Sequence, residues 1–304
     1  MLSKAKDYAL GEPNFPASRT YFERACDVQP NPAYCDNARL VNSFAHYGTI
    51  DPARAYAYFQ RSGKAIGGLN CEGSYATTCE VLGRGFMAAG RDITASMSLF
   101  ILACTGGDPR GCHQAGQHTT QNPGRTATVQ DYLRADGYFR KACAAKLVES
   151  CDRGITLRAS TTYGILEPAL ARDYFIRSGR NSSAIDCRTP ANDVCYNLGL
   201  AFSMAKYGTP QTVTAYIFLS RACDVDHPVA CRLVGIRLQE ARDYRQAAEK
   251  FVKGCNGNDG WSCEGAGKLY AWSAFNRYNR TEAQRLMTRA CTLGVSTACN
   301  FRVW

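Results

Sequence analysis

The spacing of the cysteines constrains this chain more than any other feature of its sequence. The 304 residues include 16 cysteines, which fall into eight pairs. Seven residues separate the two cysteines in seven of the pairs, and eight residues separate them in the first pair. An even number of cysteines at one recurring spacing indicates a disulfide framework, which persists only in an oxidising compartment. The pairs are Cys26/Cys35, Cys71/Cys79, Cys104/Cys112, Cys143/Cys151, Cys187/Cys195, Cys223/Cys231, Cys255/Cys263 and Cys291/Cys299.

Metal ligands and free core thiols are the alternatives to disulfides. Zinc sites use cysteines two to four residues apart with a second such pair nearby. The chain has no Cys-x-x-Cys and has four histidines. We therefore expect eight disulfides, each joining the end of one helix to the start of the next, with the pairs at Cys71 and Cys187 included. We expect no metal site and no cofactor.

A fixed spacing that recurs every 32 to 45 residues predicts an internal repeat. A small residue stands eight positions before the first cysteine of a pair and a large apolar residue four before it, which places all three on one helix face. Glycine often stands four positions after the second cysteine, in a second, shorter helix. The small residues include Ser96, Ala135, Ala215, Ala247 and Ala283; the large ones are Phe22, Phe100, Phe139, Leu219, Phe251 and Met287; the glycines are Gly83, Gly116, Gly199, Gly235 and Gly267.

Helix pairs of this kind cannot bury a core alone, so they stack. The sequence predicts an all-α fold, an α-solenoid of about eight helix pairs clipped by disulfides, as a single domain over residues 1–304. The first helix of each pair is expected to begin at a second cysteine. Residues 299–304 are expected to form the truncated first helix of a ninth unit and to cap the end.

The motif resembles Sel1-like repeats, which are related to tetratricopeptide repeats. It consists of a small residue, Tyr-Phe-x-Arg/Lys-Ala-Cys, a seven-residue spacer and Cys-x-x-Leu-Gly, as in residues 195–199 and 223–235. The cysteine-rich members that it resembles are secreted bacterial proteins and mitochondrial intermembrane-space factors for cytochrome c oxidase assembly. The resemblance implies partner binding without a shared chemistry.

Two units depart from the motif in the same way. Their second helices end in Ser-Gly at 62–63 and 178–179, and the cysteine follows eight residues later. The two variants lie 116 residues apart, which indicates that a three-unit block was duplicated. The inserted segments 64–70 and 180–186 are tolerated surface insertions or, alternatively, a paired contact site.

Charge bears on the partner. The net charge is +10; residues 1–152 have 16 basic and 14 acidic residues, and residues 153–304 have 20 and 12. The basic second half suits an acidic protein surface or anionic lipid head groups. Nucleic acid is not expected, because no basic run interleaved with aromatic residues occurs. The partner-binding candidates are Arg237, Arg242, Arg245, Lys250, Lys253, Trp272 and Trp304.

No sequence motif indicates catalysis. The chain has no G-x-S-x-G, no H-E-x-x-H and no P-loop. Ser3 to Lys6 fits the S-x-x-K signature of penicillin-binding enzymes, without its companion motifs. We therefore expect no catalytic residue and no enzyme, with a β-lactam or cell-wall acting enzyme as a remote alternative.

The compartment follows from the disulfides and from the start of the chain. Residues 1–7 lack the apolar core of a secretory signal, and no apolar run is long enough to cross a membrane. The resulting hypothesis is a non-enzymatic scaffold of the mitochondrial intermembrane space, an accessory subunit or assembly factor of a respiratory-chain complex. The alternative is a bacterial periplasmic or secreted binding protein whose signal was removed.

Overall fold

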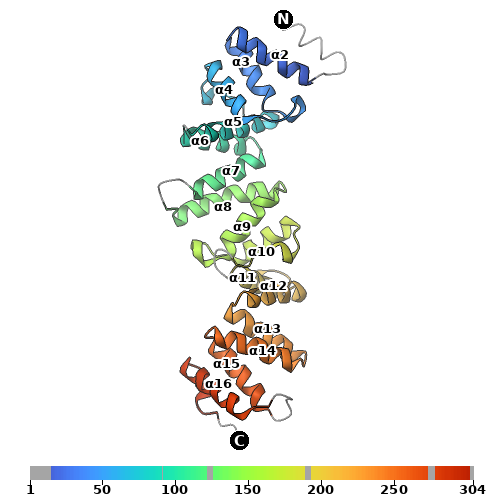
Figure 1. Cartoon of the computed structure of the whole chain (residues 1–304), viewed down its shortest axis with the longest axis vertical. Coiled ribbons are helices and arrows are strands. Elements are labelled where there is room, and N and C mark those ends of the chain that lie inside the picture. Colours follow the sequence, from blue (N-terminus) through green and yellow to red (C-terminus); the bar gives the residue numbers. More distant parts are fainter. Residues whose placement is uncertain (1–14, 91, 122–125, 189–192, 273–277, 302–304) are drawn as a thin grey trace. The chain divides into compact units, whose positions relative to one another are not determined.

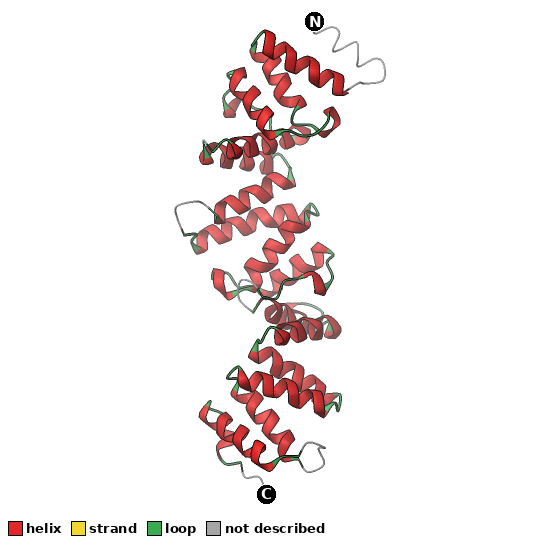
Figure 2. Cartoon of the chain, viewed as in Figure 1, coloured by secondary structure: helices red, strands yellow, loops and turns green. Residues whose placement is uncertain are grey.

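The computed structural model of the chain describes residues 15–90, 92–121, 126–188, 193–272 and 278–301 (Figure 1). All regular structure in these ranges is helical, as Figure 2 shows, and no strand occurs in them. Contacts divide the chain into two compact units, Met1–Cys151 and Asp152–Trp304. Each unit is a stack of helices in which neighbours along the chain pack together. The predicted all-α solenoid of helix pairs is confirmed, and a single domain over 1–304 stays a prediction.

The α-helices are short, and two of them make up each repeat. Unit 1 contains α2 (Phe15–Val28), α3 (Pro32–Val41), α4 (Pro52–Ser62), α5 (Ala76–Ala88), α6 (Ile93–Thr105), α7 (Pro109–Thr120), α8 (Val129–Ala144) and the start of α9 (Val148–Ala159). Unit 2 contains the rest of α9, α10 (Pro168–Ser178), α11 (Val194–Ser203), α12 (Thr212–Asp224), α13 (Pro228–Glu240), α14 (Tyr244–Asn256), α15 (Gly260–Ala271), α16 (Arg280–Thr292) and α17 (Ser296–Cys299). Short 3-10 turns lie between several of them, at Ala45–Tyr47, Ile66–Gly68, Gly73–Tyr75, Thr161–Tyr163, Ser182–Ala184 and Ala205–Tyr207.

The first helices begin before the second cysteine, so the predicted start at that cysteine is wrong. Helix α7 begins three residues before Cys112, because Asp108 accepts hydrogen bonds from two backbone N–H groups of its first turn. Proline is favoured at the first position of a helix, where its missing N–H costs no hydrogen bond, and α3, α7 and α13 all begin with proline. The second cysteine is therefore anchored inside the first turn.

The same correction applies to every other second cysteine. Each of them lies one to three residues after the start of its helix, where the backbone is already helical. These residues are Cys35 in α3, Cys79 in α5, Cys151 in α9, Cys195 in α11, Cys231 in α13, Cys263 in α15 and Cys299 in α17. For α3, α13 and α15 the physical reason is a capping side chain, of Asn31, His227 and Asp259, which sets the helix start one turn ahead of the cysteine. Helices α5, α11 and α17 also begin before the cysteine, without a side-chain cap.

All eight predicted disulfides are present with the predicted pairing. Most of them join the end of one helix to the first turn of the next. The bridges are Cys26–Cys35, Cys71–Cys79, Cys104–Cys112, Cys143–Cys151, Cys187–Cys195, Cys223–Cys231, Cys255–Cys263 and Cys291–Cys299.

Two of the bridges differ from the prediction in what they join. Cys79 and Cys195 lie in the first turns of α5 and α11, but their partners Cys71 and Cys187 lie outside any helix. Helices α4 and α10 end earlier, at Ser62 and Ser178, since the next residue is a glycine with φ of 66° and 64°. These two bridges therefore join a loop to a helix.

In most pairs a large side chain of the second helix packs on a glycine of the first. A Cβ atom added to Gly116 of α7 would lie 2.6 Å from the ring of Phe139 in α8. The same arrangement recurs in other pairs, where the added Cβ would meet the side chain at the position four before the cysteine. These contacts are Gly83 with Phe100, Gly199 with Leu219, Gly235 with Phe251 and Gly267 with Met287. The large residues of these five pairs are buried, as the helical spacing predicted.

The C-terminal end differs from its prediction. Helix α17 ends at Cys299, whereas the sequence suggested a helix that begins there. Like most of the other first helices, α17 begins three residues before its cysteine, at Ser296. The predicted cap falls largely on residues 302–304, which lie outside the described ranges.

None of the helices in the described ranges is both long and apolar enough to span a bilayer.

The glycine contacts predict opposite effects for two substitutions in neighbouring helices. Gly116→Ala should lower the free energy of unfolding by about 1 to 3 kcal/mol, because the new methyl group would displace the buried ring of Phe139. Gly137→Ala in α8 should raise it by about 0.5 to 1 kcal/mol, since nothing lies within 4 Å of its added Cβ. Denaturant unfolding of both variants measures this. An equal effect of the two substitutions would refute the packing role of Gly116.

The disulfides should differ in their reaction with reductant. Cys299 is exposed and Cys291 is half-buried, whereas the other 14 cysteines are buried. Exposed bridges are the more easily reduced ones. Limited reduction of the folded protein, followed by alkylation and peptide mass analysis, should label Cys291 and Cys299 first. First labelling at a buried pair, such as Cys223 and Cys231, would contradict this order.

Candidate functional site

Most of the basic residues that the sequence proposed for partner binding have acidic partners within unit 2. Arg237 pairs with Glu240 at 3.0 Å on α13. Arg245 lies 3.6 Å from Glu249 on α14, and both side chains are largely exposed. Exposed pairs of this kind contribute little to stability and stay available to a partner.

The two lysines of α14 hold the preceding turn. Lys250 contacts Asp224 at 3.1 Å, and Lys253 contacts Asp226 at the same distance. Lys253 also donates to the backbone carbonyl of Asp224. The turn between α12 and α13 is thus tied to the next second helix, which gives both lysines a structural role beside their proposed role in binding.

Arg242 and Trp272 are brought to one edge of unit 2. Arg242 lies in the turn between α13 and α14 with a φ of 63°, and its side chain has no hydrogen bond or ion pair with any described residue. Tyr244 opens α14, and its ring meets the ring of Trp272 edge to face at 4.9 Å. Trp272 ends α15 and is 43% exposed. Trp304, the remaining candidate, lies outside the described residues.

Part of the positive charge of unit 2 is directed at backbone carbonyls. Arg172 is 5% exposed and donates to the carbonyls of Ala201, Tyr207 and Thr209. Arg221 likewise donates to the carbonyl of Ser182 in the second inserted segment. These guanidinium groups hold loops in place, so the excess of basic residues over acidic ones overstates the basic surface that a partner would meet.

The residue directly after the second cysteine bridges neighbouring repeats, a role that the sequence analysis missed. Tyr196 stacks on His227 at 4.2 Å, and Arg232 contacts Asp259 at 3.2 Å. His227 and Asp259 cap the next first helix in each case. Other members of the set are Asp36, His113, Asp152 and Glu264, which contact Lys64, Ser150, Arg180 and Thr297. The signal in the sequence is a polar side chain at one fixed position.

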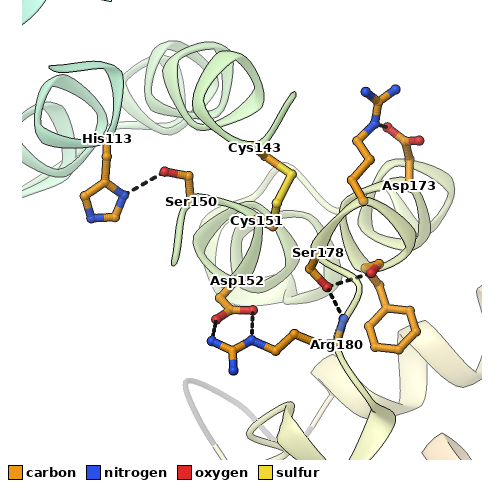
Figure 3. The surroundings of a disulfide bond; sticks show 10 residues. His113, Cys143, Ser150, Cys151, Asp152, Asp173, Ser178 and Arg180 are labelled. Carbon is orange, nitrogen blue, oxygen red and sulfur yellow. Dashed lines mark hydrogen bonds and ion pairs between the residues drawn. A yellow bond between two sulfur atoms is a disulfide. The ribbon is translucent and has the colours of Figure 1, made fainter. Parts of the chain in front are cut away.

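The two inserted segments are held by equivalent ion pairs. Arg180 donates two hydrogen bonds to Asp152, of 3.1 and 2.7 Å, as Figure 3 shows. Lys64 contacts Asp36 at 2.6 Å in unit 1, and both positions precede their counterparts by 116 residues. This agreement supports the inferred duplication. The paired contact site stays a prediction.

The arrangement around His113 does not resemble a catalytic dyad that could reach a substrate. Its Nδ1 lies 2.8 Å from the hydroxyl of Ser150, a nucleophile–base distance (Figure 3). Ser150 is fully buried at the start of α9, however. The S-x-x-K stretch at Ser3 lies outside the described residues.

No metal ligand set is found in the described ranges, where no group of three or more His, Cys, Asp or Glu residues converges. All 16 cysteines form disulfides, so no thiolate is available as a ligand. A groove of about 380 Å³ in unit 1 is lined mainly by amide and apolar side chains with His118 among them. Burial lowers the pKa of His118, and its ring stacks on Phe100.

The contact of His227 with Tyr196 between neighbouring repeats makes the stability of the protein depend on pH. Its Nδ1 accepts a hydrogen bond from the backbone N–H of Ala230, which requires that nitrogen to be unprotonated. Burial lowers its pKa below the ordinary 6.5, and Asp193 opposes the shift without cancelling it. Because the unfolded chain binds the proton more tightly, the stabilisation is present above pH 6.5 and is lost as the pH falls below it.

His227→Asn should therefore weaken the pH dependence of stability. Asparagine keeps an N-cap acceptor but does not titrate. The melting temperature of the wild type should fall between pH 7.5 and pH 5, and it should fall by less in the variant. A residual slope is expected, because the pKa of His118 is lowered in the same direction. Identical pH profiles for both proteins would refute the role of His227.

The chain has distant similarity to solved structures of repeat proteins. Neither protein-family models nor curated proteins match it. It is similar to a protective antigen of uropathogenic Escherichia coli strains with an SLR fold, at 18% identity and a TM-score of 0.43 over 94% of this chain and 59% of that one. The chain thus spans about three fifths of that protein's length. It is also similar to a Sel1 repeat protein from Oxalobacter formigenes, at 16% identity and a TM-score of 0.40 over 93% and 79%. In its repeat motif and in its helix pairs, the chain resembles Sel1-like repeat proteins.

Proposed function

We propose that the chain is a non-enzymatic scaffold that binds a protein partner in an oxidising compartment. The observation that supports this most is the exposure of large apolar side chains on helices that disulfides hold in place. On α12, Val213 is 74% exposed, and Tyr216 and Ile217 follow it on the same face. On α15, Trp261 is 53% exposed. Apolar and aromatic side chains of this kind are typical of interaction surfaces.

The compartment follows from the disulfides. Fourteen of the 16 cysteines are buried in bridges at the repeat junctions, so folding in a reducing cytosol would leave every junction open. In its finer form, the proposal is an accessory subunit or assembly factor of a respiratory-chain complex in the mitochondrial intermembrane space. The family resemblance supports this form. It equally supports the alternative, a periplasmic or secreted bacterial binding protein.

The partner is proposed to be a protein or a multisubunit complex with an acidic surface. Two arginines support this chemistry: Arg242, which pairs with no residue in the described ranges, and Arg245, which lies 3.6 Å from Glu249. Anionic lipid head groups are the competing ligand, and nucleic acid is not proposed.

Partner capture should depend on the disulfides. The test cross-links the protein to its neighbours in an extract of the cells that produce it. We expect the oxidised protein to retain a defined partner and the reduced, alkylated protein to lose it. The reason is that opening the repeat junctions removes the fixed helix surface. Cell fractionation of the source then distinguishes the two compartments.

Two results would contradict the scaffold. One is retention of the same proteins by the oxidised and the reduced chain, which would indicate unspecific adhesion. The other is hydrolysis of nitrocefin by the purified protein, which would favour the β-lactam acting alternative.

A further inference from the structure

One edge of unit 2 combines an arginine and two aromatic residues. We call Arg242, Tyr244 and Trp272 the aromatic–arginine edge. Arg242 lies two residues before Tyr244, and the ring of Tyr244 contacts that of Trp272 at 4.9 Å. Trp272 is 43% exposed, and Arg242 is exposed. Trp, Tyr and Arg are the residues most enriched among those that dominate the affinity of protein interfaces.

The backbone at Arg242 favours glycine. Its φ of 63° lies in the left-handed region, and Gly90 takes the equivalent position, with a φ of 65°, in the tight turn after α5. Side chains other than glycine are disfavoured there. Replacement of Arg242 by glycine therefore relieves a backbone constraint.

Three other residues besides glycine have the same backbone conformation. The side chain of Lys146, like that of Arg242, has no hydrogen bond or ion pair with a described residue, whereas the other two contact the chain itself. Asp226 and Asn258 also lie two residues after a helix end with positive φ. Asp226 pairs with Lys253, and the side chain of Asn258 accepts a hydrogen bond of 3.1 Å from Arg289. Each therefore stabilises the chain itself. Arg242 has no such contact with any described residue.

The acidic residues near the aromatic–arginine edge are engaged in other contacts, so the charge of Arg242 is not neutralised by them. Asp243 is engaged as the cap of α14, where it accepts hydrogen bonds from the backbone and the side chain of Gln246. Glu240 is paired with Arg237 at 3.0 Å. Arg242 has no ion pair with any residue that the structure describes, and Arg245 lies 3.6 Å from Glu249 on α14. A carboxylate on a partner would satisfy the guanidinium of Arg242.

We propose that the aromatic–arginine edge binds an acidic polypeptide segment that carries an apolar anchor residue. A partner carboxylate binds Arg242, and the anchor packs on the exposed face of Trp272, which Tyr244 holds edge to face. This inference rests on the proposed scaffold function and assigns it a surface and a partner chemistry.

The test uses a short fluorescent peptide rich in Asp and Glu with one Leu and one Phe, titrated with the full oxidised chain. Arg242→Gly should weaken its binding about 10-fold while the melting temperature stays the same or rises, because glycine suits the backbone. Lys146→Gly is the matched control. Lys146 has a φ of 67° at the equivalent point after α8 in unit 1, so its replacement relieves the same backbone constraint away from the edge.

A second pair of variants tests the apolar contact. Trp272→Ala should weaken peptide binding, and Tyr75→Ala, which removes an aromatic side chain of similar exposure in unit 1, should not. Unchanged affinity of Arg242→Gly, or an equal loss with Lys146→Gly, would overturn the proposal. So would equal binding of a peptide in which Lys replaces Asp and Glu, or preferential binding to phosphatidylglycerol vesicles. Concentration-dependent dimerisation that Arg242→Gly abolishes would assign the edge to a second copy of the chain instead.

The same variants separate this proposal from the scaffold function. If the oxidised protein captures a partner and the Arg242→Gly variant retains it in full, the scaffold function is supported and the proposed binding role of the aromatic–arginine edge is wrong. If neither protein captures a partner nor binds the peptide, both proposals fail.

Discussion

The packing of one large side chain on one glycine sets the geometry of most helix pairs. At Gly83 and Gly235, an added Cβ would lie 2.7 Å from the nearest ring atom, of Phe100 and Phe251 respectively. The glycine lets the two helices approach until the ring fills the space between them. In six of the eight bridges the disulfide then fixes the start of the next first helix against the end of this second helix, and in the other two it fixes it against a loop. The glycine contact and the disulfide together determine where the polar faces of the repeat lie.

Polar side chains join one pair to the next. In six repeats the residue after the second cysteine contacts the following repeat, and in two of these its partner caps the next first helix, as with Arg232 and Asp259. Arginines such as Arg172 hold the connecting loops through backbone carbonyls. A chain with a net charge of +10 therefore presents a less basic surface than its composition suggests. The polar side chains that make none of these contacts between repeats or with loops are available to a partner.

The proposed function depends on the difference between residues that hold the helices in place and residues that stay exposed. Core glycines, buried bridges and caps keep the helices in place, so the exposed side chains need little ordering when a partner binds. Arg242 is exposed, and no hydrogen bond or ion pair joins its side chain to a described residue. Its neighbour Tyr244 orients the exposed ring of Trp272. A rigid surface with an exposed indole and a cation that pairs with none of the described residues is suited to protein recognition.

The sequence by itself determined the disulfide pairs, the helix pairs and the buried face of the second helices, because these follow from local spacing along the chain. It did not determine that glycines such as Gly116 receive the large residue, or that Asp152 meets Arg180, since both depend on contacts between helices. Helix starts were misplaced because caps act a turn before the cysteine. Of the proposed binding residues, the sequence identified Arg242 and Trp272 by type. The tertiary structure decided which cations are unpaired, because pairing is a matter of distance in space.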